Sequence, residues 1–250
     1  MKNGWGLAGF LSGTSYNPPV KSEIMAIHSK ILVHWTGKDI ETNPVEDEKS
    51  QLYVERLKDD LIEGLYAKPT IEDSIRGLKI KDITRVCFTE IRLSQAKTHS
   101  DQYGKLGIGF SRDFIMNKGG RPVIYIPFEP PADNYLLEAS IRNVYEGTKN
   151  ICEIKESSKL ILAHVKRMSD ENKYDYYEEM EWRMVHHTND KNIINTVSDI
   201  HRLKFEMSDI EVIIFPDKKT KQLSLEDNYI KDCFSKHKPI IATLDDCLNF

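Results

Sequence analysis

The sequence lacks the short motifs that mark several large enzyme classes. Its 250 residues contain no G-x-x-x-x-G-K-S/T loop, no H-E-x-x-H and no G-x-S-x-G. These absences remove the usual signatures of P-loop nucleotide hydrolysis, zinc-dependent proteolysis and α/β-hydrolase chemistry. Gly104, Gly107 and Gly109 do not complete a dinucleotide-binding fingerprint, because strand-forming residues follow them instead of a long helix.

Cysteine and long apolar runs are also scarce. The four cysteines lie far apart and form no C-x-x-C pair, so the sequence predicts neither a disulfide framework nor a zinc ribbon. No apolar run approaches the ~20 residues that a membrane helix needs. We therefore expect a cytoplasmic protein that does not contact a membrane. His186 and His187 predict no metal site, because neighbouring strand residues face opposite sides of a sheet.

Charge of one sign is not in excess either. The chain has 35 Lys and Arg against 39 Asp and Glu, which gives a formal charge of -4 with both signs interspersed. Such a balance provides no overall attraction to nucleic acid. Contact with single-stranded RNA or DNA would need a local basic patch, for example Lys97, Lys105, Arg112, Lys118 and Arg121.

The pattern of apolar residues predicts one α+β domain over residues 21–250, after an irregular arm at 1–20 that is rich in glycine, serine and proline. Strands and helices are interleaved without strict βαβ alternation, which favours a mixed or antiparallel sheet core with flanking helices. The expected strands cover 31–35, 86–89, 106–110, 122–127, 180–186, 201–205, 211–215 and 239–243. The expected helices cover 45–67, 111–116, 132–168 with a break near Gly147, and 223–235.

A run of acidic residues passes directly into the strand expected at 180–186. Because side chains alternate along a strand, Glu179, Glu181 and Arg183 share one face, and we expect Trp182 to point into the core. Carboxylates at the mouth of a strand suit the stabilisation of positive charge that develops in a transition state. The alternative is an edge strand with a solvated acidic face, and the residue types alone favour it.

Two further stretches place polar groups at strand ends. His34-x-Thr36-Gly37 ends the first expected strand, and Tyr103 leads into a glycine-rich strand, where Gly104, Gly107 and Gly109 allow close approach of a ligand or another backbone. A buried, hydrogen-bonded histidine and a tyrosine in a turn are the structural alternatives. Neither stretch is decisive alone.

The chain resembles the AbiGi family of bacterial abortive-infection proteins over roughly residues 30–215. Five blocks carry the resemblance: H-W-T-G at 34–37, C-F-T-E-I at 87–91, Y-G-K-L-G-I-G-F-S at 103–111, R-P-V-I-Y at 121–125 and E-M-E-W-R at 179–183. The resemblance implies a role in phage defence, as the antitoxin of a toxin–antitoxin pair.

The order His34, Tyr103, Glu181 is also similar to the triad of ADP-ribosyltransferases, which implies a fold of that type and NAD as the cofactor. By this resemblance, His34 hydrogen-bonds the adenosine-side ribose, and the backbone near Thr36 and Gly37 holds the nicotinamide carboxamide. Tyr103 stacks on the nicotinamide ring. Glu181 hydrogen-bonds the 2′-hydroxyl of the nicotinamide ribose.

Cleavage of the nicotinamide glycosidic bond passes through an oxocarbenium-like state that a carboxylate stabilises. Glu179 can orient or deprotonate the acceptor, which is a nucleic-acid base or a protein side chain. Arg112 or Arg183 can meet the pyrophosphate.

Two other functions stay open. One is a catalytically silent protein of the same fold that neutralises a partner toxin. The other is a nuclease that holds magnesium through Glu90, Glu179 and Glu181.

Overall fold

The computed structural model describes residues 29–69, 80–90, 92–126, 136–148, 150–168, 179–188, 190, 193–195 and 201–248. The irregular arm predicted for residues 1–20 lies outside the described residues, as do the first residues of the predicted domain.

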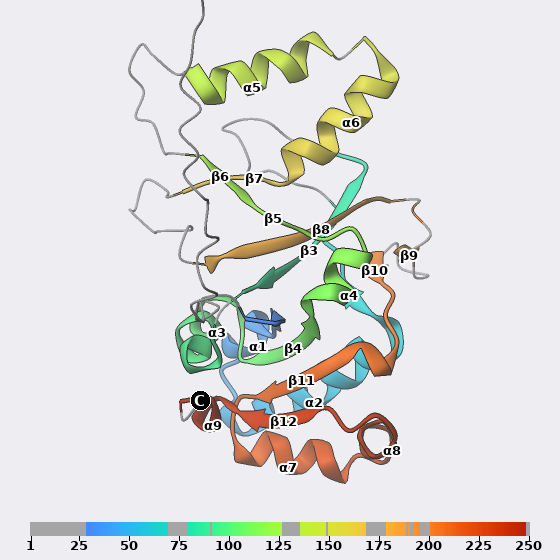
Figure 1. The fold of residues 1–250 in the computed structure, drawn as a ribbon. Coiled ribbons are helices and arrows are strands. Elements are labelled where there is room, and N and C mark those ends of the chain that lie inside the picture. Colours follow the sequence, from blue (N-terminus) through green and yellow to red (C-terminus); the bar gives the residue numbers. More distant parts are fainter. Residues whose placement is uncertain are drawn as a thin grey trace, which may run out of the picture.

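A seven-stranded sheet forms the centre of the described fold, in the order β12-β11-β4-β1-β3-β8-β5 (Figure 1). Neighbouring strands run antiparallel, except that β11 and β12 are parallel. This arrangement confirms the predicted α+β class with a mixed, mostly antiparallel sheet. The strands are β1 (Ile31–Thr36), β3 (Ile83–Thr89), β4 (Leu106–Ser111), β5 (Arg121–Pro122), β8 (Glu181–His187), β11 (Ile210–Phe215) and β12 (Ile240–Thr243).

Two small sheets accompany the large one. The first contains β2 (Leu65–Tyr66), β10 (His201–Leu203) and β9 (Ile193–Asn195), and the second pairs β6 (Ile124–Ile126) with β7 (Val165–Arg167). The helices are α1 (Lys38–Glu41), α2 (Glu46–Glu63), α3 (Ala96–Tyr103), α4 (Arg112–Asn117), α5 (Leu136–Gly147), α6 (Cys152–Ala163), α7 (Lys218–Glu226), α8 (Asn228–His237) and α9 (Leu244–Cys247). Among the described helices, none combines the length and apolar character required to span a bilayer.

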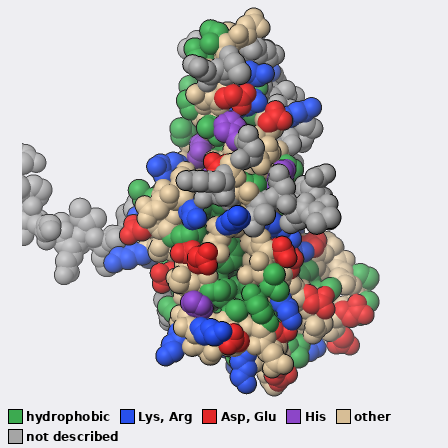
Figure 2. Space-filling model, turned by 90° about the vertical axis from the view of Figure 1, so that its right-hand side faces the viewer, with side chains coloured by type: hydrophobic (Ala, Val, Ile, Leu, Met, Phe, Trp, Pro, Cys, Tyr) green, Lys and Arg blue, Asp and Glu red, His purple; other side chains and the backbone are tan. Residues whose placement is uncertain are grey.

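The helices cover different parts of the sheet. Helices α2, α7 and α8 lie beside the half formed by β4, β11 and β12, whereas α5 and α6 lie beyond the half formed by β3, β8 and β5 (Figure 1). Leu57 of α2 and Phe234 of α8 join Ile108 and Phe110 of β4 in the largest apolar cluster. Acidic and basic side chains are interspersed on the face displayed in Figure 2, in line with the balanced charge of the sequence.

The glycines of β4 make room for neighbouring side chains. A Cβ atom at Gly109 would lie 2.4 Å from Cγ1 of Val212, and one at Gly107 would lie 2.9 Å from the ring of Trp35. At Gly107 and Gly109 side chains of β1 and β11 fill the space expected for a ligand or another backbone, whereas Gly104 does admit another backbone, that of Thr36 and Lys38.

Several expected element boundaries are wrong for identifiable reasons. The helix expected to reach residue 67 ends at Glu63, because Gly64 adopts a φ of 95° and Leu65 starts β2. The helical pattern expected to reach 168 ends at Ala163, and β7 follows it. The helix expected at 223–235 divides where the Asp227 side chain accepts hydrogen bonds from the first turn of α8. The strand expected at 122–127 divides between β5 and β6.

The large sheet opens between β1 and β3. Among their residues, only Val33 and Thr89 form a Cα pair, whereas β1 and β4 pair from Ile31 to Thr36. Hydrogen bonds that involve side chains connect β1 and β3 where backbone pairing between the two strands is missing. The Trp35 Nε1–H donates to Thr89 Oγ1 over 3.0 Å, and His34 Nδ1 lies 2.8 Å from the carbonyl oxygen of Cys87. The two strands therefore diverge while staying connected.

One buried carboxyl group makes the stability of the fold depend on pH. Asp60 of α2 is buried, with Oδ1 3.4 Å from Nη1 of Arg202. Burial raises the pKa of Asp60 to about 7, although Arg56 and Arg202 act to lower it. In the unfolded chain, the pKa of an aspartate is about 3.9. Between these two values the folded chain keeps a proton that the unfolded chain releases, so stability falls as the pH rises.

We expect Asp60→Asn to remove this decrease of stability with rising pH and to stabilise the protein by about 1–2 kcal/mol near neutral pH and above. Urea unfolding of both proteins between about pH 5 and pH 8 measures the difference. Asp59→Asn is the matched control, because Asp59 also contacts Arg202, at 2.6 Å, from a more exposed position. If the unfolding free energy depended on pH equally in wild type and Asp60→Asn, the raised pKa of Asp60 would be contradicted.

Candidate functional site

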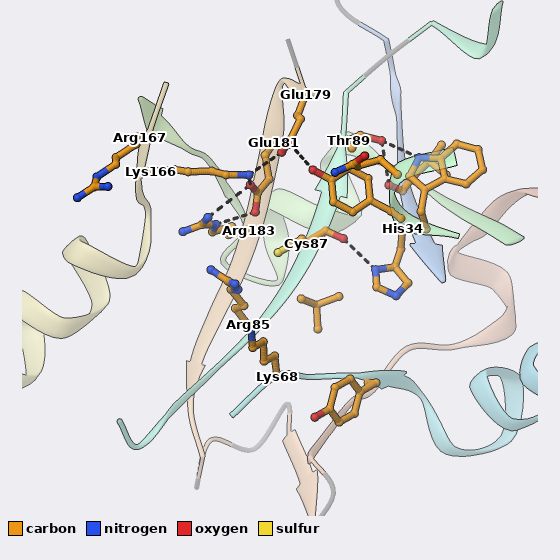
Figure 3. Close-up of a pocket in the computed structure, with 16 residues that line it drawn as sticks. His34, Lys68, Arg85, Cys87, Thr89, Lys166, Arg167, Glu179, Glu181 and Arg183 are labelled. Atoms are coloured by element: carbon orange, nitrogen blue, oxygen red, sulfur yellow. Dashed lines mark hydrogen bonds and ion pairs between the residues drawn. The ribbon is translucent and has the colours of Figure 1, made fainter. Parts of the chain in front are cut away.

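A cavity of about 690 Å³ opens where β1 and β3 diverge (Figure 3). Residues of β1, β3 and β8 form its sheet-side wall, α3 and β7 contribute further side chains, and Tyr66 and Lys68 come from β2 and the residues after it. The size is typical of a site for a small molecule or a dinucleotide. Its walls come from segments that lie far apart in the sequence.

The predicted triad converges on this cavity. His34, Tyr103, Glu179 and Glu181 all line it, and Arg183 lies beside them. The remaining predicted binding residues do not line it. Thr36 Oγ1 accepts a hydrogen bond from Arg56 over 3.0 Å, and Gly37 is the N-cap residue of α1.

Arg112 also lies away from the cavity, where its guanidinium pairs with the carboxylate of Glu90. It further donates to the carbonyl oxygen of Ser29.

The acidic strand is buried. Glu179, Glu181 and Arg183 are 2%, 5% and 1% exposed, and β8 lies between β3 and β5. The alternative of an edge strand with a solvated acidic face is therefore wrong. Trp182 packs in the main apolar cluster on the opposite face, as expected from the alternation. The sheet places the carboxylates towards the cavity.

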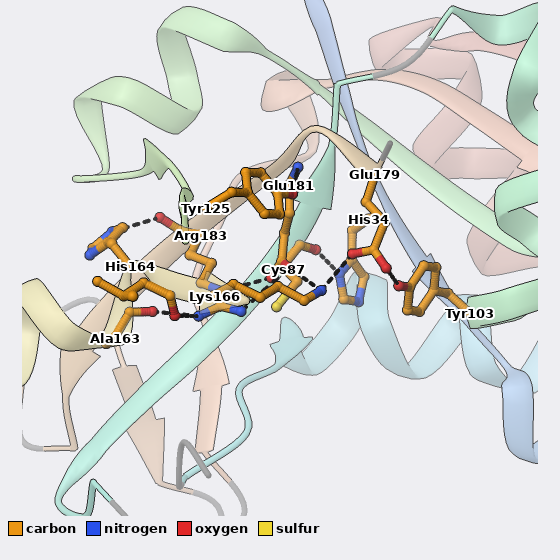
Figure 4. Close-up of polar contacts among 11 residues, drawn as sticks. His34, Cys87, Tyr103, Tyr125, Ala163, His164, Lys166, Glu179, Glu181 and Arg183 are labelled. Atoms are coloured by element: carbon orange, nitrogen blue, oxygen red, sulfur yellow. Dashed lines mark hydrogen bonds and ion pairs between the residues drawn. The ribbon is translucent and has the colours of Figure 1, made fainter. Parts of the chain in front are cut away.

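Lys166 connects the two glutamates. Its Nζ atom lies 2.6 Å from Oε2 of Glu179 and 2.8 Å from Oε2 of Glu181 (Figure 4). Arg183 holds the other side of Glu181, with Nε 2.7 Å from Oε1. The Arg183 guanidinium also donates to the carbonyl oxygen of Ala163 over 2.7 Å. One ammonium and one guanidinium therefore balance the two buried carboxylates.

These contacts keep Glu181 ionised. Burial alone would raise its pKa, but the positive charges of Arg183 and Lys166 outweigh burial and hold the pKa well below its usual value. The Glu181 backbone N–H donates to Tyr125 Oη over 2.9 Å, which fixes the start of the strand. Met180, immediately before it, has a φ of 44°, a left-handed conformation that is costly for a residue with a side chain.

Tyr103 reaches the acidic group from the last turn of α3. Its hydroxyl donates to Oε1 of Glu179 (Figure 4). Gly104 ends the helix with a φ of 114° and lies against the backbone of Thr36 and Lys38. This close approach places the tyrosine beside the end of β1, where His34 also lies.

His34 is held in one tautomer. A carbonyl oxygen only accepts hydrogen bonds, so Nδ1 carries the proton that is donated to Cys87 over 2.8 Å. Burial lowers the pKa of His34, with Arg56 adding to the effect, so the ring is neutral at physiological pH. Nε2 is then an acceptor on a ring that lines the cavity.

Some cavity residues were missed by the interpretation of the sequence. Lys166 lies in a segment expected to be helical, and only its pairing with β6 reveals its position. Arg85 carries a weak signal, because Arg85, Cys87 and Thr89 alternate with the buried Val86 and Phe88 along β3. Burial and the charge of Glu181 raise the pKa of Cys87 to about 12, which makes its thiol unreactive.

The magnesium site of the nuclease hypothesis is not assembled. Within the described ranges, no group of three His, Cys, Asp or Glu side chains is placed to hold a metal ion. Glu90 instead contacts Arg112 and accepts a hydrogen bond from Trp182 Nε1 over 2.6 Å.

A mostly antiparallel sheet with flanking helices and a cavity lined by charged side chains defines the chain as an α+β protein. Residues 65–216 match the family described as abortive phage resistance protein AbiGi, antitoxin, and the chain belongs to this family. The match begins at β2, later than the expected residue 30, so His34 lies outside it.

Two solved structures of Thermus sp. 2.9 DarT are similar to the chain. The complex with NAD+ has 10% sequence identity and a TM-score of 0.35, and the likeness covers 87% of this chain and 96% of DarT. The complex with carba-NAD+ has 11% identity and a TM-score of 0.34, with 86% and 94% covered. A comparison with curated protein sequences finds no match.

Proposed function

We propose that the cavity binds NAD and that the chain transfers ADP-ribose to a nucleic-acid base or a protein side chain as part of phage defence. The observation that supports this most directly is the convergence of His34, Tyr103 and Glu181 on one cavity. The three residues come from β1, α3 and β8, and they resemble in kind and order the triad of ADP-ribosyltransferases.

Glu181 is suited to the charge that develops in this reaction. Loss of nicotinamide leaves positive charge on the ribose, and a fixed carboxylate in a poorly hydrated site stabilises it. The lowered pKa keeps the carboxylate charged at any physiological pH. Lys166 and Arg183 fix its position, so little reorganisation accompanies the reaction.

The other two groups position the substrate. The neutral His34 offers Nε2 to a ribose hydroxyl, and the ring of Tyr103 offers a surface on which the nicotinamide stacks. Glu179 accepts from the tyrosine hydroxyl and is available to orient the acceptor nucleophile. Much of the acceleration then comes from holding the leaving group in line with the reacting carbon.

Release of nicotinamide from NAD tests the proposal. We expect Glu181→Gln to lower the rate by about 100-fold, because it removes the charge opposite the ribosyl cation while keeping the shape of the side chain. Glu63→Gln is the control, since Glu63 is an exposed residue at the end of α2. Equal rates for wild type and Glu181→Gln, or no release with RNA, DNA and protein acceptors present, would overturn the proposal.

A second candidate function is a catalytically silent antitoxin that neutralises a partner toxin. The contacts of Glu181 favour it, because Arg183 and Lys166 already occupy both carboxylate oxygens in the chain alone. The family description, which names an antitoxin, points the same way. Under this alternative, wild type releases no nicotinamide, and co-purification with the product of a neighbouring gene is unaffected by His34→Ala and Glu181→Gln.

A further inference from the structure

The positive charges of the cavity fall into two groups. Five cationic side chains line it against two carboxylates. Lys166 and Arg183 contact the glutamates directly. Lys68 and Arg85 lie together at another part of the wall, away from Glu179 (Figure 3). The cavity as a whole is therefore suited to an anionic ligand, and its charge is unevenly distributed.

An antiparallel backbone bridge places Lys68 and Arg85 opposite each other. The N–H of Lys68 donates to the carbonyl oxygen of Arg85 over 2.9 Å, and the N–H of Arg85 donates to that of Lys68 over the same distance. Two residues that exchange both hydrogen bonds in an antiparallel bridge face each other directly, with their side chains on the same side. The bridge therefore fixes an ammonium and a guanidinium as opposite neighbours on the cavity wall.

One of the two opposing cations is buried and the other is exposed. Arg85 is only 9% exposed, so its guanidinium is largely removed from water. An anion between the two side chains would accept charge-assisted hydrogen bonds from both.

We propose that Lys68 and Arg85 form a subsite for the diphosphate group of a dinucleotide. Two adjacent cations suit a ligand that carries two adjacent phosphates better than a ligand that carries a single carboxylate. Tyr66 lies two residues before Lys68, lines the same cavity and is half exposed, so it presents an aromatic ring beside the charges, as a nucleoside base requires. The identity of the ligand as NAD rests on the proposed function, whereas the anion subsite does not.

The subsite gives the ligand a direction in the cavity. With the diphosphate at Lys68 and Arg85, one nucleoside extends towards Tyr66 and the other towards the group formed by Tyr103, Glu179 and Glu181. In this arrangement Lys68 and Arg85 contact the pyrophosphate, the role that the sequence suggested for Arg112 or Arg183. Arg112 pairs with Glu90 away from the cavity, and Arg183 is committed to Glu181.

Calorimetric titration with inorganic pyrophosphate at low ionic strength tests the subsite. We expect Arg85→Gln to weaken binding by at least about tenfold and Lys68→Gln by about threefold, because the more buried cation makes the stronger charge-assisted contact. Lys97→Gln, which removes an exposed charge from α3 outside the cavity, should bind as wild type does. Inorganic phosphate should bind more weakly than pyrophosphate. Because Lys68 is exposed, its variant remains informative even if Arg85→Gln fails to fold.

The outcomes separate this inference from the proposed function. Weakened pyrophosphate binding in both variants supports the subsite, even if wild type releases no nicotinamide from NAD. Pyrophosphate that binds wild type and both variants equally, that does not bind wild type, or that binds no better than phosphate overturns the subsite, even if NAD is cleaved. Glu181→Gln serves as the cross-check, since it should lower nicotinamide release by about 100-fold without weakening pyrophosphate binding.

Discussion

Replacement of Arg183 by glutamine is expected to lower the free energy of unfolding by about 3–5 kcal/mol. Arg183 is 1% exposed and holds Glu181 through Nε over 2.7 Å and through Nη2 over 3.4 Å. Its guanidinium also satisfies the carbonyl oxygens of Ala163 and Val165, at the end of α6 and the start of β7. Glutamine would leave a buried carboxylate with Lys166 as its remaining cation and would remove donors from both carbonyls.

Urea unfolding of wild type and Arg183→Gln measures this loss. Arg92→Gln is the matched control, because it removes an arginine from an exposed position and should change stability by less than about 0.5 kcal/mol. The double variant Glu181→Gln/Arg183→Gln should recover part of the loss, since no unbalanced charge then remains. A loss below about 1 kcal/mol in the single variant would mean that Lys166 alone balances Glu181.

Replacement of Gly104 by alanine is expected to cost about 3 kcal/mol of stability and to disturb the cavity. Gly104 has a φ of 114°, and a Cβ there would lie 2.2 Å from the carbonyl oxygen of Thr36 and 2.5 Å from the backbone nitrogen of Lys38. Both neighbours are backbone atoms, which cannot turn aside as a side chain would. The end of α3 must therefore shift, and Tyr103 moves with it away from Glu179.

Thermal unfolding of Gly104→Ala, together with binding of NAD, measures both effects. Gly147→Ala is the matched control, because a Cβ at the end of α5 meets no atom within 4 Å. That variant should be neutral or stabilised by up to about 1 kcal/mol, since alanine lowers the entropy of the unfolded chain. Equal melting temperatures for the two variants would show that α3 does not depend on the glycine.

The sequence predicted residues on the acidic side of the cavity because those residues carry local signals. The acidic run before β8 places Glu179 and Glu181 on the face of Arg183, since alternation along a strand follows from the backbone alone. Tyr103 leads into a glycine-rich strand, and His34 lies near the end of an apolar run. Such features are visible without any knowledge of the tertiary fold.

The cationic side of the site could not be predicted in the same way. Lys68 and Arg85 meet through one isolated backbone bridge, and Lys166 reaches the glutamates from a short strand that pairs with β6. Nothing near Lys68 or Lys166 distinguishes them from surface lysines, and the alternation along β3 gives Arg85 only a weak signal. Arg112 was misplaced for the same reason, because its pairing with Glu90 joins the first residue of α4 to the residue after β3, which lies far away in the sequence.

The divergence of β1 from β3 has a mechanical consequence. Within the described residues, the two halves of the large sheet meet at one Cα pair and are otherwise connected by the side chains of His34, Trp35 and Thr89. Each such hydrogen bond contributes about 0.5–1.5 kcal/mol, far less than a continuous ladder of backbone bonds. The seam between the halves therefore opens at a smaller energetic cost than a continuous backbone ladder would.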